Sequence, residues 1–260
     1  MSLQGKRAVI SGASRGIGFA CAQQLRKAGA DVFLLASDSA RLALAKQQLA
    51  IQGTGEIGFY AADLRDLKGC EQAVNAYIEQ FSSCDIFVHS AGATKGGVFP
   101  DQPDEDYLDG FALKFHAGVR LSRLFWPYLK QSKGNIVMIN GTAARTPSKG
   151  FLVGGAVNSA LANFSKGLAD QGLEDDINVN WINPGLTQTD RLITLFEKQA
   201  KEAGKSIEEI AASRVENEGI RRMGQPEDIA ALTVFLCSPA ARHIHGTGIN
   251  VDGGSTRGYF

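Results

Sequence analysis

The sequence predicts a doubly wound α/β domain, with a mostly parallel seven-stranded sheet and helices on both faces. Seven short apolar segments alternate with stretches of helical length, and the 260 residues include 30 glycines but only 7 prolines. Strands that are covered by helices on both faces are apolar along their whole length, and glycine suits the tight turns between strands and helices. Since no linker-like stretch divides the chain, we expect residues 1–260 to form one domain.

The elements follow one another regularly from the N-terminus, apart from two segments. A long helix with an apolar side is expected from Leu108 to Lys130, and a charged insertion covers residues 189–219, before the last helix. An insertion after the carboxyl end of a strand lies where α/β sheets bind ligands, so it is either a lid or a solvated helical excursion. The expected strands cover residues 7–11, 31–36, 56–61, 85–90, 135–140, 177–182 and 248–251.

Composition and charge exclude several classes of protein. Lys+Arg and Asp+Glu both number 27, so the formal net charge is zero and no broad basic field favours nucleic acid. No apolar run reaches the ~18 residues of a membrane span, and the N-terminus lacks the apolar stretch of a secretory signal. Cys21, Cys70, Cys84 and Cys237 are scattered, without metal-ligand spacing. We therefore expect reduced thiols, no metal site, a cytoplasmic location and a small-molecule substrate, with no nucleic acid or membrane as partner.

A glycine-rich turn follows the first strand and opens a helix. Its glycines have the spacing G-x-x-x-G-x-G, and glycine lets a backbone approach a pyrophosphate closely while the helix N–H groups point at it. The segment therefore predicts a dinucleotide site. Its candidate cofactor-binding residues are Gly12, Ser14, Arg15, Gly16, Ile17 and Gly18.

Over essentially its whole length the chain resembles the short-chain dehydrogenase/reductase family. The resemblance is carried, in order, by SGASRGIG, Asp63-Leu64, HSAG (89–92), NPG (183–185), GQPEDIA and VDGG. It implies a Rossmann-type fold, an NAD(P)(H)-dependent oxidoreductase of a carbonyl or alcohol substrate, and a homodimer or homotetramer built through the long helix and the next one.

The resemblance also implies roles for single residues. Asp63, followed by Leu64, would receive the adenine amino group, and Ala91 and Gly92 would pass close to the ribose. His89 stands where the family usually has Asn, and we interpret it as a structural substitute. The residues that would frame the nicotinamide and its phosphate are Pro184, Gly185, Thr187 and Thr189.

The choice between NADP and NAD depends on the end of the second strand. Acceptance of NAD usually depends on an acidic residue there, and the alignment places Ala36 at that position, followed by Ser37 and Asp38. Ser37 stands where the family often has an Arg for the 2′-phosphate, and Arg15 could serve instead. We expect NADP(H) rather than NAD, with Asp38 as the residue that would favour NAD.

The residues that usually perform catalysis in the family are absent. Gly154 aligns with the family's Tyr, Asn158 with its Lys, Gly141 with its Ser and Lys114 with its Asn. No tyrosine lies anywhere in 129–258, so no shifted alignment can supply one. The usual tyrosine-dependent acid–base mechanism therefore cannot operate.

Other residues could still form a different catalytic site. Lys114 and Asn158 look exchanged relative to the family, and Lys114 could hold the nicotinamide ribose or, with a pKa lowered by burial, handle a proton. The hydroxyl of Thr142 could bind a substrate oxygen. The alternative is that Lys114 is a structural charge within a helix pair. Gly141 and Gly154 would also leave a roomier pocket, which either admits a bulkier ligand or reflects relaxed constraint.

Two further features carry weaker expectations. Tyr259 of a neighbouring subunit could replace the missing tyrosine. Arg145, Lys149 and Arg191 could attract an anionic substrate, although we expect mostly solvated surface there.

The leading hypothesis is thus an oxidoreductase with an active site around Lys114, Thr142 and Asn158. The alternative is a dinucleotide-binding protein without hydride transfer, acting as a sensor or partner subunit. A third hypothesis is non-redox chemistry, such as proton abstraction or dehydration.

Overall fold

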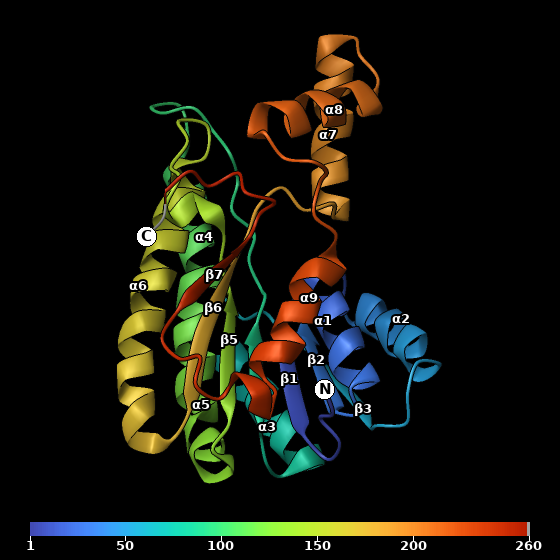
Figure 1. Ribbon diagram of the computed structural model, residues 1–260, viewed down its shortest axis with the longest axis vertical. Coiled ribbons are helices and arrows are strands. Elements are labelled where there is room, and N and C mark those ends of the chain that lie inside the picture. The colour runs from blue at the N-terminus through green and yellow to red at the C-terminus, as the bar shows by residue number, and fades with distance from the viewer. Residues whose placement is uncertain (259–260) are drawn as a thin grey trace.

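The computed structural model, which describes residues 1–258, is a three-layer α/β structure built on one parallel sheet (Figure 1). The strands are arranged in the order β3-β2-β1-β4-β5-β6-β7, and every neighbouring pair is parallel. The predicted fold class is confirmed. The strands are β1 (Arg7–Ser11), β2 (Asp31–Ala36), β3 (Ile57–Ala61), β4 (Ile86–His89), β5 (Asn135–Ile139), β6 (Asn178–Pro184) and β7 (Gly248–Val251).

Helices cover both faces of this sheet. Helices α1, α2 and α9 pack on one face, and α3, α5 and α6 pack on the other. The α-helices are α1 (Gly16–Lys27), α2 (Ser39–Ala50), α3 (Leu67–Phe81), α4 (Asp104–Gly110), α5 (Ala117–Ser132), α6 (Leu152–Asp175), α7 (Asp190–Ala203), α8 (Ile207–Glu218) and α9 (Pro226–Leu236).

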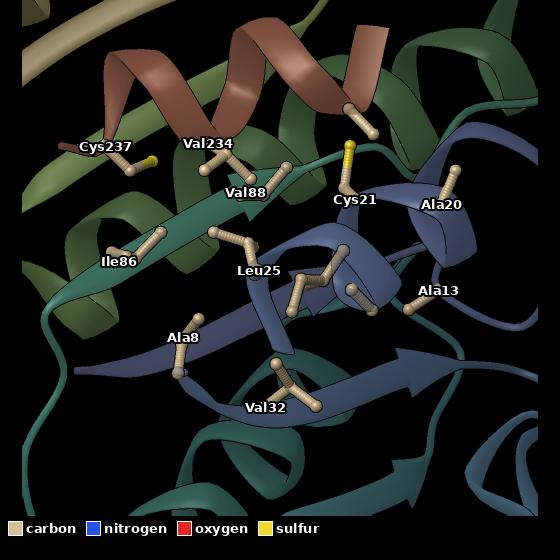
Figure 2. Close-up of a cluster of buried hydrophobic side chains, with 14 of the residues drawn as sticks. Ala8, Ala13, Ala20, Cys21, Leu25, Val32, Ile86, Val88, Val234 and Cys237 are labelled. Carbon is tan, nitrogen blue, oxygen red and sulfur yellow. The ribbon is translucent and has the colours of Figure 1, made fainter. Parts of the chain in front are cut away.

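Alternate residues of each central strand enter opposite cores, as the period of a strand requires. Val88 of β4 belongs to the core beneath α1 and α9, whereas Phe87 belongs to the core beneath α3 and α5. Figure 2 shows the first core, where Val88 lies close to Leu25 of α1 and Val234 of α9. This two-sided burial explains why the central strand segments are mostly apolar.

The carboxyl ends of β1 and β4 form the point where the winding of the sheet reverses. From β1 the chain winds outward to β2 and β3 and then returns to β4 on the other side of β1. Loops that leave two such strands diverge and open a crevice, which is the usual ligand site of α/β sheets. Gly12 follows β1, and Ser90 follows β4, so both lie at this crevice.

The two irregular segments are largely helical. Residues 104–132 form α4, a π-helical turn at Phe111–His116 and α5, so the helix extends beyond the expected limits and contains a register change. The insertion folds into α7 and α8, which project beyond the end of the sheet (Figure 1). Within the described part of the chain, no helix is both long and apolar enough to cross a membrane.

Candidate active site

The glycine turn after β1 is as tight as its residue types suggest. A Cβ on Gly12 would lie 2.8 Å from the backbone nitrogen of Ala91, and a Cβ on Gly18 would lie 2.3 Å from the backbone oxygen of Gly12. Gly12 and Gly16 also have φ angles of +70° and +57°, which side chains rarely allow. The turn delivers the chain into α1, whose first turn contains no acidic residue, so its N–H groups remain available to an anion.

One cavity of about 410 Å³ extends from this turn across the carboxyl ends of the central strands. It brings together most of the predicted cofactor residues and, on its other wall, Lys114. The predicted residues that line it are Gly12, Ser14, Arg15, Gly16, Ile17, Gly18, Ser37, Asp63, Leu64, Ala91, Gly92, Lys114 and Thr189. The predicted residues outside this lining are Thr142, Asn158, Pro184, Gly185 and Thr187.

The segment after β6 leads the chain to Thr189, which lines the cavity. A Cβ on Gly185 would lie 2.7 Å from Cβ of Asp252, and the hydroxyl of Thr187 donates to the backbone oxygen of Gly185 at 3.0 Å. Thr187 also forms a parallel bridge with Gly224. These contacts fix the path that leads to Thr189, which caps α7 by accepting a hydrogen bond from the backbone of Leu192.

The end of β2 offers no acidic side chain to a ribose. Asp38 caps α2, accepting from the backbone nitrogen of Arg41 at 3.0 Å and pairing with its guanidinium at 3.3 Å. Ser37 and Arg15 are exposed at the cavity instead. A hydroxyl and a guanidinium suit a 2′-phosphate, so this end of the cavity matches NADP(H). Asp63 lies nearby and is exposed, with its carboxylate paired to Arg65 at 3.2 Å.

Lys114 reaches the cavity from the π-helical turn. Its Nζ donates to the backbone oxygen of Asn140 at 2.9 Å. Removal from water lowers the pKa of Lys114 to about 7, and the positive charge of Arg191 adds to this effect. At neutral pH the amine is therefore available in both its charged and its neutral form.

Asn140, whose backbone oxygen accepts that hydrogen bond, begins a row of hydrogen-bonded asparagine side chains at the ends of three strands. The Asn140 amide donates to Asn183 at 3.1 Å, and the Asn183 amide donates to Asn250 at 2.9 Å. Sequence reasoning missed Asn140, although its place after the fifth strand was a usable signal, because the carboxyl ends of parallel strands gather at one edge.

The backbone of Lys114 is held by a buried histidine. The hydroxyl of Ser11 accepts from the backbone nitrogens of Ser90 and Ala91, at 3.1 and 3.2 Å, so it donates its proton to Nδ1 of His89 at 2.9 Å. Nε2–H of His89 then donates to the carbonyl of Lys114 at 2.9 Å. Burial lowers the pKa of His89 to about 4, so the imidazole is neutral. His89 thus has a structural role, and it binds a carbonyl within the π-helical turn, a kind of turn that often marks functional sites.

The expectation of a roomier pocket at Gly141 and Gly154 is wrong. A Cβ on Gly154 would lie 1.9 Å from Cε1 of Phe151, whose ring therefore fills the space that a side chain at position 154 would need. A Cβ on Gly141 would lie 3.0 Å from Nδ2 of Asn158. Neighbouring side chains therefore fill the space beside these two glycines, and no extra pocket volume remains there.

Asn158 and Thr142 lie beside the strand end that Lys114 contacts. Asn158 is buried in α6, and its Oδ1 accepts no hydrogen bond from the described residues. Thr142 begins the short 3₁₀ turn (Thr142–Ala144) that follows Gly141. Tyr259, the expected substitute from another subunit, lies outside the described residues.

Arg191, one of the charges that the sequence suggested could attract an anionic substrate, lines the cavity. It is exposed in the first turn of α7, and its Nη2 donates to the backbone oxygen of buried Thr94. Other lining residues that were not predicted are Ala36, Ala62, Arg65, Ser90, Ala93, Leu113, Ile139, Asn140 and Asp190.

Known proteins resemble this chain along its whole length. The family model described as enoyl-(acyl carrier protein) reductase matches residues 12–256. An uncharacterised oxidoreductase from Mycobacterium tuberculosis is 31% identical over 98% of this chain and 93% of its own length. The solved structure of L-sorbose reductase from Gluconobacter frateurii, complexed with NADPH and L-sorbose, is 32% identical with a TM-score of 0.96 and covers 99% of both chains. An NADPH-bound short-chain oxidoreductase from Pseudomonas aeruginosa PAO1, containing an atypical catalytic center, is 27% identical with a TM-score of 0.90 and covers 99% of both chains.

Proposed function

Because this chain belongs to the short-chain dehydrogenase/reductase family and is an NAD(P)-dependent oxidoreductase, we propose that it interconverts a carbonyl and an alcohol with NADP(H), using Lys114 in place of a tyrosine. The observation that carries the proposal is the position of Lys114. Its amine lies in the wall of the same cavity that the glycine turn lines.

The residues present fit a dinucleotide. A Cβ on Gly12 or Gly18 would collide with backbone, so the turn has room for a close approach only because these positions lack side chains. Beside this turn, the N-terminus of α1 favours a pyrophosphate, and Arg15 with Ser37 favours a 2′-phosphate. The bound cofactor would supply or accept the hydride, and the chain must supply the proton.

Lys114 supports that proton transfer. General acid–base catalysis is most efficient when the pKa of the group lies near the working pH, and the pKa of Lys114 is lowered to about 7. As an ammonium, Lys114 would donate a proton to the oxygen of a carbonyl substrate. As an amine, it would accept the proton of an alcohol in the reverse direction.

Thr142 and Asn158 complete the proposed site in different roles. Thr142 would offer its hydroxyl to the substrate oxygen. Asn158 would act as a positioning residue, because its side chain packs against Gly141, next to the carbonyl of Asn140 that accepts from Lys114.

The test separates cofactor binding from turnover. Lys114→Met and the exposed control Lys166→Met would be titrated with NADPH by nicotinamide fluorescence, then assayed with aldehydes and ketones. We expect all three proteins to bind NADPH similarly, whereas Lys114→Met loses about 10²-fold or more in turnover. Full turnover by Lys114→Met would refute the role of Lys114, and absence of turnover by the unmodified protein with every substrate would refute the proposed reaction.

We further propose that the protein acts in the cytoplasm as a single-domain subunit of a homodimer or homotetramer. Its four cysteines are buried and form no disulfide, which supports a reducing compartment. Light scattering of the purified full chain would test the oligomeric state, and a monomer would contradict it.

A further inference from the structure

Two positively charged side chains approach the same loop at one end of the cavity. Arg191 donates to the backbone oxygen of Thr94, and the side chain of Lys114 packs over Gly92, where a Cβ would lie 3.0 Å from Cδ of the lysine. Gly92 and Thr94 are two residues apart. The guanidinium is close enough that its charge contributes to the lowered pKa of Lys114.

No carboxylate of the described residues neutralises either side chain. Among the ion pairs of residues 1–258, none includes Lys114 or Arg191. Asp190 also lines the cavity, but it pairs with neither. Arg191 lies in the first turn of α7, where the helix dipole disfavours a cation. Two like charges that repel each other beside an open cavity are a typical arrangement for recognising an anion.

The phosphates of the cofactor have hydrogen-bond donors of their own in the glycine turn. Thr189 begins α7 beside the glycine turn, since its Cγ2 would lie 3.6 Å from a Cβ on Gly16. From there Arg191 extends to Thr94, and its guanidinium lies near enough to both Arg15 and Lys114 for the charges to interact. The glycine turn, the N-terminus of α1 and Arg15 remain for the phosphates.

We infer that Arg191 binds a carboxylate of the substrate beside the carbonyl that Lys114 serves, so that the substrates are oxo acids and their hydroxy-acid partners. This inference rests on the proposed function, because it takes the Lys114 end of the cavity as the substrate end. The guanidinium presents parallel N–H donors that match the two oxygens of a carboxylate. Binding of the carboxylate would replace the contact of Arg191 with Thr94 and balance the charge of the cation pair.

The experiment compares acids with their neutral esters. The full chain, loaded with NADP⁺ so that no carbonyl is reduced, would be titrated calorimetrically with 2-oxobutyrate, 3-oxobutyrate and 4-oxopentanoate and with the methyl ester of each. Arg191→Gln would be compared with the control Arg214→Gln, which removes the same charge from α8, where Arg214 pairs with Glu218 at 3.5 Å.

We expect at least one acid to bind about tenfold or more tightly than its ester, and Arg191→Gln to abolish that difference. Arg214→Gln should retain the difference, and all three proteins should bind NADP⁺ with similar affinity. Equal binding of acids and esters, or no binding of any acid, would overturn the inference. A parallel loss of NADP⁺ affinity in Arg191→Gln would also overturn it, because Arg191 would then serve the cofactor.

The outcomes also separate this inference from the proposed function. An acid preference that depends on Arg191, without oxidation of NADPH by any carbonyl compound, would leave the carboxylate site standing and refute the proposed reaction. Reduction of neutral ketones without any preference for acids would refute the carboxylate site and leave the reaction standing.

Discussion

Replacing Lys114 with methionine should make the fold more stable at neutral pH and leave it unchanged at strongly alkaline pH. In the folded protein the pKa of Lys114 is lowered from 10.5 to about 7 by desolvation and by Arg191. The unfolded chain therefore holds the proton more tightly than the folded one between these two pH values, so protonation of Lys114 opposes folding.

The magnitude follows from that difference. Each tenfold weakening of proton binding corresponds to about 1.4 kcal/mol. The lowered pKa therefore means that protonated Lys114 destabilises the fold by at most about 5 kcal/mol. Lys114 is only partly buried at the edge of an open cavity, and solvent screening reduces this to roughly 2 kcal/mol. Below pH 7 the lysine is protonated in both states and the whole penalty is present. As pH rises toward 10.5 the penalty disappears.

The assay is urea denaturation of the cofactor-free protein, followed by tryptophan fluorescence, at several pH values between 6 and 10. The free energy of unfolding of Lys114→Met should exceed that of the unmodified protein by roughly 2 kcal/mol at pH 6–7, and this difference should shrink toward zero near pH 10. Lys166→Met, at an exposed position that pairs with Asp170, should show no such slope. A difference for Lys114→Met that does not change with pH would refute the lowered pKa.

Three other changes probe the cofactor end and the buried supports of the site. Arg15→Gln should weaken NADPH binding about tenfold and leave NADH binding unchanged, since only NADPH carries the 2′-phosphate; equal weakening in fluorescence titrations would contradict this role. Gly154→Tyr should destabilise the fold by about 1–3 kcal/mol because its side chain meets the Phe151 ring, and adding Phe151→Ala should recover part of the loss in urea denaturation; an unaffected Gly154→Tyr would contradict the packing. Ser11→Ala should cost about 1–3 kcal/mol, because two backbone N–H groups and Nδ1 of His89 lose their partner; thermal unfolding at an unchanged temperature would argue against this network.

The sheet and the glycine turn could be predicted from the sequence because their signals are local. A strand between two helical layers must be apolar on both sides, as RAVIS and DIFVHS are. A turn that must approach other backbone closely requires glycine, as at Gly12 and Gly18. The insertion at 189–219 could be recognised for a similar reason, since its charges contrast with the apolar segments around it, although its role as a lid stays a prediction.

The contacts around Lys114, Phe151 and Arg191 depend on tertiary packing, which cannot be predicted from single residues. The sequence does not show that Phe151 folds back over Gly154, because a phenylalanine beside glycines is compatible with many positions. Nor does it distinguish Arg191 from the other charges of the insertion, since its position at the cavity depends on where α7 starts. The carbonyl of Lys114 in the π-helical turn binds His89, a residue 25 positions earlier in the chain.

The Phe151 ring over Gly154 also limits how this protein could change in evolution. A lineage that regained a tyrosine at position 154 would first pass through a crowded variant, and one that first shortened Phe151 would pass through a variant with a cavity. Both intermediates are less stable than the starting protein, and neither has yet gained a working tyrosine. The two positions are therefore epistatic, and the fold itself would hinder the return of that tyrosine.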